Sequence, residues 1–380
     1  MTSDSGSVHN IHYGDILVKY DEVVSLLHHN VDCLTVEGET NSPKDYICDG
    51  DVIIADTAED ETVGKTVEIQ DVGNSKVVAG LHTFLYRPPS NMFVRGWLGY
   101  WMNSSAYHSQ LFQYMTGTKV LSLTRTSIAA TVIQYPSKEL QQQIVTALDS
   151  IQTQINATQK LIAKYEAIKK ATVNLLLKPK AGWDKIRLGD FESHRNNTCS
   201  RSLTSRTGYI HNIHYGDILV KFGEIVSLKQ DQVAYLSEEG EANSPNDYLQ
   251  DGDIVIADTA EDETAGKVVE VQDVSNRKAV AGLHTVFLRP PTDLFARGWL
   301  GYWMNSRFYH DQLLPYLTGI KVLSLAKSSL TNTEIYYPSR TEQEQLVRTL
   351  ESIDTHLVAL HTQAEKARYL KAGMMSYFFG

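Results

Sequence analysis

Residues 49–65 read DGDVIIADTAEDETVGK, and residues 251–267 read DGDIVIADTAEDETAGK. The two stretches are 202 residues apart and differ only by exchanges among Val, Ile and Ala. The same offset relates HNIHYGDILVK at 9–19 to the identical sequence at 211–221. A repeat this close indicates one fold that occurs twice in the chain.

The repeat continues to the end of the chain, with one exception. RGWLGYWMNS occurs at 95–104 and again at 297–306, in the same register. Residues 181–202, AGWDKIRLGDFESHRNNTCSRS, have no counterpart ahead of Met1. The first copy is therefore expected to lack an opening segment that the second copy has.

Each copy begins with a part of mixed secondary structure. Short apolar runs such as DILVKY (15–20), DVIIAD (51–56) and KTVEIQDV (65–72) alternate with Gly, Asn, Asp and Pro, which predicts strands joined by turns. Residues 95–115 instead have the apolar spacing of a helix. The sequence thus predicts a globular part that combines α and β elements.

Each copy then changes to a heptad pattern, from 138 to about 178 and from 341 to about 379. Apolar residues recur in steps of three or four, which predicts two helices of roughly 58 Å, each with one apolar seam that can pack against the other. A step of three after Tyr165 and Ala367 predicts a local change of supercoil. A single helix lying on its own domain is the alternative. The seams begin with Ile144, Leu148, Ile151, Ile155 and Ile162 in the first copy and with Leu346, Leu350, Ile353, Leu357 and Leu360 in the second, and they continue to Leu175 and Tyr377.

Composition excludes several classes of protein. The chain has 380 residues, 42% hydrophobic and 21% charged, which is typical of about two or three globular domains. It has no apolar stretch near the roughly 18 residues of a transmembrane helix and no secretory leader, so we expect a cytoplasmic protein. Its 3 cysteines lack CxxC spacing, which argues against a disulfide framework or a zinc site. Walker A, GxGxxG, HExxH and GxSxG sequences are absent, so no cofactor and no catalytic centre are expected.

An acidic cluster leaves one enzymatic alternative open. Asp56, Glu59 and their copies Asp258 and Glu261 follow apolar runs, and paired carboxylates can bind a divalent metal or act as acid and base. A metal-dependent hydrolase would use them, although a solvated turn is the expected structure there. The His9/His12 spacing would need a helix to converge on a metal, so turn histidines are expected instead.

Basic residues offer the candidates for nucleic-acid contact. A formal charge of −10 disfavours nonspecific coating of nucleic acid, because phosphate affinity comes mainly from clustered Lys and Arg. In TGTKVLSL (116–123) and TGIKVLSL (318–325), however, Gly and Lys in a short loop suit a phosphate. In the unpaired segment, Arg and Asn are the types that read guanine and adenine. The candidates are Lys19, Lys119, Arg125, Arg195, Asn196, Asn197, Arg201, Arg206, Lys221, Lys321 and Lys327.

Taken together, HYGDI, DGDIVIADTAEDET, TGxKVLSL and a Pro-led helix with a Gln-rich start, all occurring twice, resemble the specificity subunit of type I restriction-modification systems. The resemblance implies an α+β fold: two similar mixed α/β target recognition domains joined by two long helices that form an antiparallel coiled coil. It implies target recognition domains at 1–137 and 181–339 and conserved helices at 138–180 and 340–380.

The same resemblance implies a function in DNA recognition. Such a subunit is noncatalytic, binds double-stranded DNA at a split target and docks methyltransferase subunits, and restriction subunits join through the complex. Two recognition domains this similar predict a palindromic target. A structural or assembly protein, with duplicated binding heads on a coiled coil, is the alternative from another class.

Overall fold

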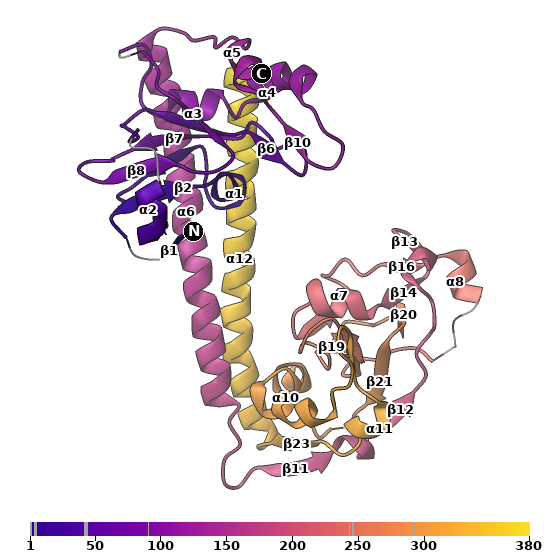
Figure 1. The fold of residues 1–380 in the computed structure, drawn as a ribbon. Coiled ribbons are helices and arrows are strands. Elements are labelled where there is room, and N and C mark those ends of the chain that lie inside the picture. Colours follow the sequence, from indigo (N-terminus) through magenta and orange to yellow (C-terminus); the bar gives the residue numbers. More distant parts are fainter. Residues whose placement is uncertain are drawn as a thin grey trace. The chain divides into compact units, whose positions relative to one another are not determined.

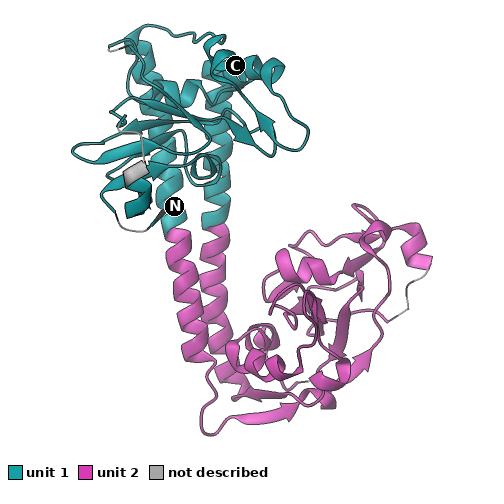
Figure 2. Cartoon of the chain, in the orientation of Figure 1, with its two compact units in different colours: residues 1–160, 360–380 teal, residues 161–359 magenta. Residues whose placement is uncertain are grey.

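The computed structural model describes residues 2–3, 6–41, 45–89, 91–242, 244, 247–291 and 293–380. The chain forms two compact units (Figure 2): unit 1 comprises residues 1–160 and 360–380, and unit 2 comprises residues 161–359. Two long helices, α6 (Lys138–Leu176) and α12 (Arg340–Phe379), each contribute one part to either unit. None of the helices within the described residues is long and apolar enough to cross a membrane.

Within its described residues, unit 1 is built on three sheets, with strand orders β1-β4-β2-β8, β3-β7-β5-β9 and β10-β6. Most neighbours are antiparallel, but β2 pairs with β8 and β3 with β7 in parallel. The strands are β1 (Thr2–Ser3), β2 (Val8–Ile11), β3 (Val23–Ser25), β4 (Cys33–Leu34), β5 (Val52–Ala55), β6 (Thr57–Ala58), β7 (Thr66–Gln70), β8 (Lys76–Ala79), β9 (Thr83–Tyr86) and β10 (Leu121–Ser122). The short helices are α1 (Tyr13–Val18), α2 (Val36–Asn41), α3 (Trp97–Trp101), α4 (Ser105–Leu111), η1 (Phe112–Tyr114) and α5 (Arg125–Ala129).

Unit 2 repeats this plan and adds two strands at its start (Figure 1). The added strand β11 pairs with β23, and β12 extends the central sheet to β12-β21-β17-β19-β15. Its strands are β11 (Asp184–Arg187), β12 (Glu192–His194), β13 (Thr204–Ser205), β14 (Ile210–Ile213), β15 (Ile225–Ser227), β16 (Tyr235–Leu236), β17 (Ile254–Ala257), β18 (Thr259–Ala260), β19 (Val268–Gln272), β20 (Lys278–Ala281), β21 (Thr285–Arg289), β22 (Leu323–Ser324) and β23 (Glu334–Tyr337). Its short helices are η2 (Leu188–Asp190), η3 (Arg201–Leu203), α7 (Tyr215–Val220), α8 (Glu238–Ala242), α9 (Trp299–Met304), α10 (Arg307–Leu313), η4 (Leu314–Tyr316) and α11 (Lys327–Leu330).

The core of unit 1 lies on both faces of the β5 sheet. Val52 and Ile54 face a cluster that includes Trp97, whereas Ile53 and Ala55 face a second cluster that includes Ile16. All of β5 is buried. A strand buried on both faces reads as a continuous apolar run, so DVIIAD and KTVEIQDV formed the predicted strands β5 and β7.

The start of α3 rests on a buried carboxylate. The backbone N–H groups of Gly96 and Gly99 donate to Glu68, at 2.5 and 3.1 Å from its two oxygens. Burial raises the pKa of Glu68 to about 7. Glu270 holds Gly298 and Gly301 in unit 2 in the same way, at 2.5 and 3.2 Å, and burial also raises its pKa to about 7.

The prediction of a strand over DILVKY was wrong, since this segment forms helix α1. The His12 ring accepts a hydrogen bond from Gly14 N–H at 3.2 Å, and Asp15 accepts one from His12 N–H at 3.4 Å, which makes a capping box. Ile16 is buried while Val18 is 90% exposed, as expected for a one-sided helix. His214 caps α7 with the same 3.2 Å contact to Gly216, so these histidines have a structural role.

Candidate nucleic-acid interface

Each unit projects a short hairpin that carries one of the predicted phosphate-binding lysines. Thr116 and Ser122 exchange backbone hydrogen bonds at 3.1 and 2.8 Å, and Leu121–Ser122 pairs with β6. Gly117 has φ +125°, and a Cβ there would lie 1.9 Å from the Val120 carbonyl oxygen, so the turn requires glycine. Lys119 is exposed at the tip.

The second hairpin repeats this geometry. Thr318 and Ser324 exchange hydrogen bonds at 3.1 and 2.9 Å, and Gly319 also has φ +125°. Lys321 is exposed, and its neighbour Ile320 is 100% exposed. An exposed cation at the tip of a hairpin suits contact with a phosphate group of duplex DNA.

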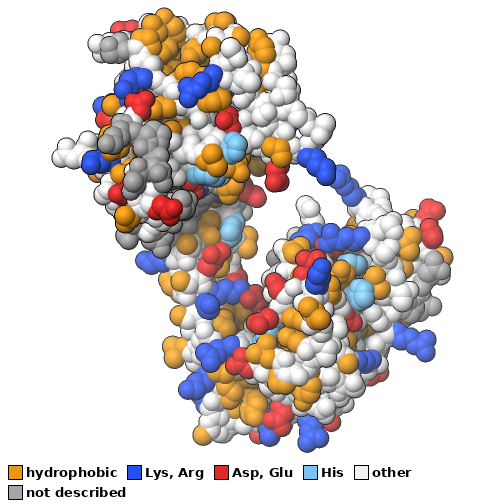
Figure 3. Space-filling model, in the orientation of Figure 1, with side chains coloured by type: hydrophobic (Ala, Val, Ile, Leu, Met, Phe, Trp, Pro, Cys, Tyr) orange, Lys and Arg blue, Asp and Glu red, His pale blue; other side chains and the backbone are white. Residues whose placement is uncertain are grey.

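Three of the four other paired basic candidates contact groups within their own units. Lys19 lies 3.2 Å from Asp32, and Lys221 donates to the Gln232 carbonyl. Arg125 begins α5 and stacks over the Phe84 ring at 4.8 Å, while its counterpart Lys327 begins α11 and is exposed. Figure 3 shows Lys and Arg interspersed with Asp and Glu on the face drawn. Arg125 and Lys327 are thus the candidates nearest to the hairpins in sequence, because only a few residues separate them from β10 and β22.

The segment that only unit 2 possesses divides into exposed and buried candidates. Arg195 is exposed, and Arg201 is paired with Asp217 at 3.0 Å while its side chain stays 60% exposed. Arg206, which follows the segment, is also exposed. Asn196 donates to the Gly282 carbonyl at 3.2 Å. The arginines of this segment can therefore reach a ligand in this geometry.

A side chain that reads DNA bases must be exposed to solvent, but Asn197 is not. It is 1% exposed, its amide donates to Asn212 at 2.8 Å, and its carbonyl oxygen accepts from Cys199 N–H at 2.8 Å. Both polar ends are thus used to hold the segment against unit 2. Composition could not reveal this, because a buried Asn and a solvent-facing Asn have the same identity.

Asp60 and Asp262, which follow the candidate carboxylates Glu59 and Glu261 in the sequence, close tight turns. Asp60 accepts hydrogen bonds from both the backbone and the hydroxyl of Thr62, at 2.9 and 2.5 Å, and Asp262 does the same with Thr264. These bonds keep the pKa of Asp60 and Asp262 below the ordinary range. Within the described part of the chain, no three His, Cys, Asp or Glu side chains gather closely enough to hold a metal ion.

The long helices contact each other within each unit, and they run antiparallel there. In unit 2, Tyr165 packs on His356 with ring centroids 5.7 Å apart, and Lys169 lies 2.7 Å from Asp354. In unit 1, Lys371 donates to Gln152 at 2.6 Å. Residues with higher numbers in α6 therefore contact residues with lower numbers in α12.

Most of each predicted seam is buried or half-buried, but its last residue is exposed. Ile144, Leu148, Ile155, Leu346 and Leu350 are buried, and Ile151, Ile162, Ile353, Leu357 and Leu360 are half-buried. Leu175 and Tyr377, in contrast, are 73% and 84% exposed, so the seam prediction was wrong there. Beyond the irregular step, the buried face moves to Leu177 and Phe379, because each helix end packs into a domain rather than only on its partner.

A pair of Lys–Glu contacts was missed by the sequence analysis. Lys169 lies 2.8 Å from Glu224, and Lys371 contacts Glu22 in the same manner. Lys169 and Lys371 are 202 residues apart, as are Glu22 and Glu224. The Lys at equivalent late positions of both heptad helices was the feature of the sequence that could have indicated these contacts.

The chain was compared with known proteins at three levels. No family model and no curated protein matches it. Among solved structures, the type I restriction-modification S subunit from M. genitalium is 10% identical, with a TM-score of 0.57, covering 100% of this chain and 90% of that one.

Two further solved structures are similar over the whole chain. A chain from a structure of the type I R-M system, described for complex assembly and conformational transition, is 19% identical with a TM-score of 0.53, covering 98% of this chain and 90% of that one. The HsdS subunit from Thermoanaerobacter tengcongensis is 18% identical with a TM-score of 0.41, covering 100% and 93%. The M. genitalium S subunit and the type I R-M system chain show that this chain has the fold of chains from type I systems, including an S subunit.

Proposed function

We propose that the chain is the DNA sequence-specificity subunit of a type I restriction-modification complex. The observation that carries the proposal is the fold similarity over the full length, since both copies and both long helices take part in it. A fold alone does not determine a protein's function, because function depends on the sites that the fold carries.

In this proposal α6 and α12 form one antiparallel coiled coil along their whole length. The contacts of Lys169 with Asp354 and of Lys371 with Gln152 support it. Each of these pairs is the counterpart of the other after exchange of the two helices. Such exchange is the property of a pseudo-two-fold axis between the helices.

The recognition domains bind DNA and do no chemistry. The hairpin lysines Lys119 and Lys321 contact phosphate groups, with Arg125 and Lys327 beside them, and the domain surfaces around them read base edges. Methyltransferase subunits dock on the coiled coil and carry out the methylation, and restriction subunits join through them. These partners also supply positive surface that a chain of net charge −10 lacks.

A binding experiment separates this function from that of a structural or assembly protein. The chain, purified in complex with its methyltransferase partner, is used to select duplexes from a random library. A DNA specificity subunit enriches one split motif with an affinity at least about 1,000-fold above bulk DNA. An assembly protein enriches no motif, and that outcome would refute the proposal.

A further inference from the structure

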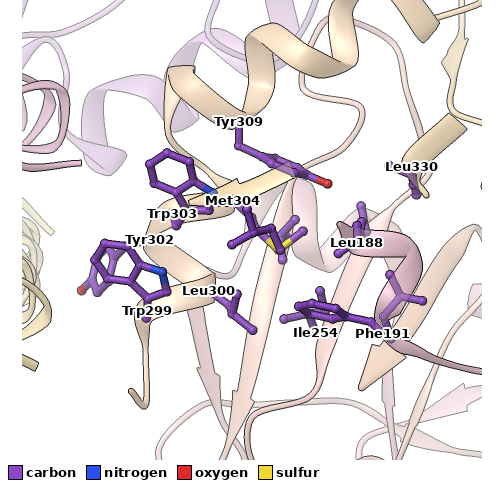
Figure 4. Close-up of a cluster of buried hydrophobic side chains, with 14 of the residues drawn as sticks. Leu188, Phe191, Ile254, Trp299, Leu300, Tyr302, Trp303, Met304, Tyr309 and Leu330 are labelled. Atoms are coloured by element: carbon purple, nitrogen blue, oxygen red, sulfur yellow. The ribbon is translucent and has the colours of Figure 1, made fainter. Parts of the chain in front are cut away.

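The two copies differ most at residues 181–202, a segment that has no counterpart in the first copy. Figure 4 shows Leu188 and Phe191 of this segment inside the apolar cluster, beside Ile254. Leu188 is 1% exposed and Phe191 is 5% exposed. The segment is therefore a structural part of unit 2, although residues 1–160 contain no equivalent of it.

Unit 1 has an open apolar groove at the equivalent position. Its volume is about 380 Å³. Nine of the 15 residues that line it lie 202 positions before a residue of the cluster that surrounds Leu188 and Phe191. The lining includes Val52, Leu98, Met102, Tyr107, Ile128 and Ile133.

Backbone edges are also left open beside this groove. In unit 2, β21 lies between β12 and β17, whereas its counterpart β9 is an edge strand in the sheet order of unit 1. In unit 2, β23 pairs with β11, whereas residues 132–135 belong to no strand in the described chain. Accordingly Ile335 of β23 is fully buried, while Ile133 is half-buried.

The walls of the groove already have the geometry of the filled site. Tyr107 and Thr131 hydroxyls are 3.0 Å apart, as are those of Tyr309 and Thr333. Gln110 bonds the backbone of Val132 at 2.9 and 3.1 Å, and the equivalent bonds in unit 2 measure 2.9 and 3.0 Å. A preorganised site binds without the free-energy cost of rearranging its walls.

We propose that this groove binds an extended polypeptide segment from outside residues 1–380, with the pattern Ile-x-Leu-Gly-x-Phe found at residues 186–191. The segment adds one strand to β9 and another to residues 132–135, and its Leu and Phe side chains fill the cavity. This is binding by strand addition, in which backbone hydrogen bonds give affinity and side-chain pockets give specificity.

Glycine is required within this pattern. In unit 2, Leu188 N–H donates to the Thr333 carbonyl at 2.9 Å and Gly189 N–H to the Thr331 carbonyl at 3.2 Å. A Cβ on Gly189 would lie 2.9 Å from that Thr331 oxygen. The carbonyls of Ala129 and Thr131 occupy these positions in unit 1, so a segment with a larger residue in place of Gly does not fit.

The test uses the full chain and a labelled peptide with the sequence of residues 183–195, WDKIRLGDFESHR. Fluorescence anisotropy is expected to show saturable one-to-one binding. Peptides with Leu188→Asp and Phe191→Asp, or with Gly189→Val, should bind more than about tenfold more weakly, because they place a charge in an apolar pocket or a clash against the wall.

Variants of the chain locate the binding site. Ile133→Asp places a carboxylate in the groove and should abolish peptide binding, while its half-exposed position lets unit 1 fold. Val132→Glu is the matched control, since residue 132 is 61% exposed and its counterpart is Glu334. It should preserve or strengthen binding, since Glu334 accepts hydrogen bonds from Lys185 of this segment at 2.9 and 3.1 Å in unit 2. Binding that survives Ile133→Asp would overturn the proposal.

A fusion protein that carries the segment covalently tests the groove without relying on the affinity of a free peptide. Joining residues 178–202 ahead of residue 1 should raise the unfolding temperature of unit 1, and the same fusion with Leu188→Asp and Phe191→Asp should not. Equal unfolding temperatures for the two fusions would contradict the proposal. A concentration-dependent dimer that Ile133→Asp dissociates would assign the groove to a second copy of the chain, and so would also refute an outside segment.

Discussion

The ammonium group of Lys371 donates a hydrogen bond to the carboxylate of Glu22, and so joins two residues that are 349 positions apart. The side chains are only 11% and 19% exposed. The C-terminal part of α12 therefore packs within unit 1, and Lys169 contacts Glu224 in the same way in unit 2.

Removal of Lys371 is expected to destabilise unit 1. Lys371→Ala leaves Glu22 without its cation in a largely buried place, which should lower the free energy of unfolding by about 2 kcal/mol. Calorimetry of the full chain measures the effect, with the exposed Lys366→Ala as the matched control. Equal stability of the two variants would show that the contact contributes nothing.

The end of α12 should matter still more. Phe379 is 3% exposed and packs edge-on against Trp97 and Trp101, with ring centroids at 5.2 and 5.7 Å. Phe379→Ala should cost about 3 to 5 kcal/mol through the cavity it leaves. Tyr377→Ala, two residues earlier and 84% exposed, should cost less than about 0.5 kcal/mol. If Tyr377→Ala lowered the unfolding temperature more than Phe379→Ala does, the burial of Phe379 at the end of α12 would be disproved.

The pH dependence of stability should report on the buried carboxyls Glu68 and Glu270. Burial raises the pKa of each to about 7 in the folded state, against an ordinary value of 4.5. The folded state therefore binds more protons than the unfolded state between these values. The stability that each protonated carboxyl contributes is full below about pH 4.5 and is lost as pH rises to about 7.

Substitution of these carboxyls isolates the effect. The advantage of the wild type over Glu68→Gln, measured as a difference in unfolding temperature, should be larger at pH 5 than at pH 8. The exposed Glu59→Gln should show the same difference at both pH values. A pH-independent difference for Glu68→Gln would mean that its pKa is not raised.

The hairpin lysines should contribute to DNA binding without selecting sequence. Lys119→Ala or Lys321→Ala should weaken binding of the methyltransferase complex to every duplex, and should lower the slope of log affinity against log salt by about one unit. Fluorescence titrations at several salt concentrations measure this slope. An unchanged slope together with altered sequence preference would make these lysines base-reading residues.

Much of the fold could be predicted from the sequence, because repeats and apolar runs are local signals. The heptad pattern predicted helices at 138–178 and 341–379, and the structure has Lys138–Leu176 and Arg340–Phe379. The apolar run DVIIAD predicted β5. DILVKY was assigned wrongly because its apolar run hid the capping box of His12, which requires the backbone to turn.

The candidate site was less predictable. Burial of Asn197 depends on its contact with Asn212, and the Lys371–Glu22 contact depends on how distant segments meet. Neither leaves a periodic pattern in the sequence. The turn glycines Gly117 and Gly319 were visible in the sequence, but the rigidity of their hairpins follows from close backbone contacts that only the structure gives.

In the proposed function, two nearly identical domains read one split DNA target, one half-site each. Sequencing of the methylated bases in cells that carry this chain with its methyltransferase partner tests it most directly. The expected result is one half-site, a spacer of fixed length and the inverted half-site, methylated on both strands. Two unrelated half-sites, or the absence of any motif that depends on this chain, would contradict the account.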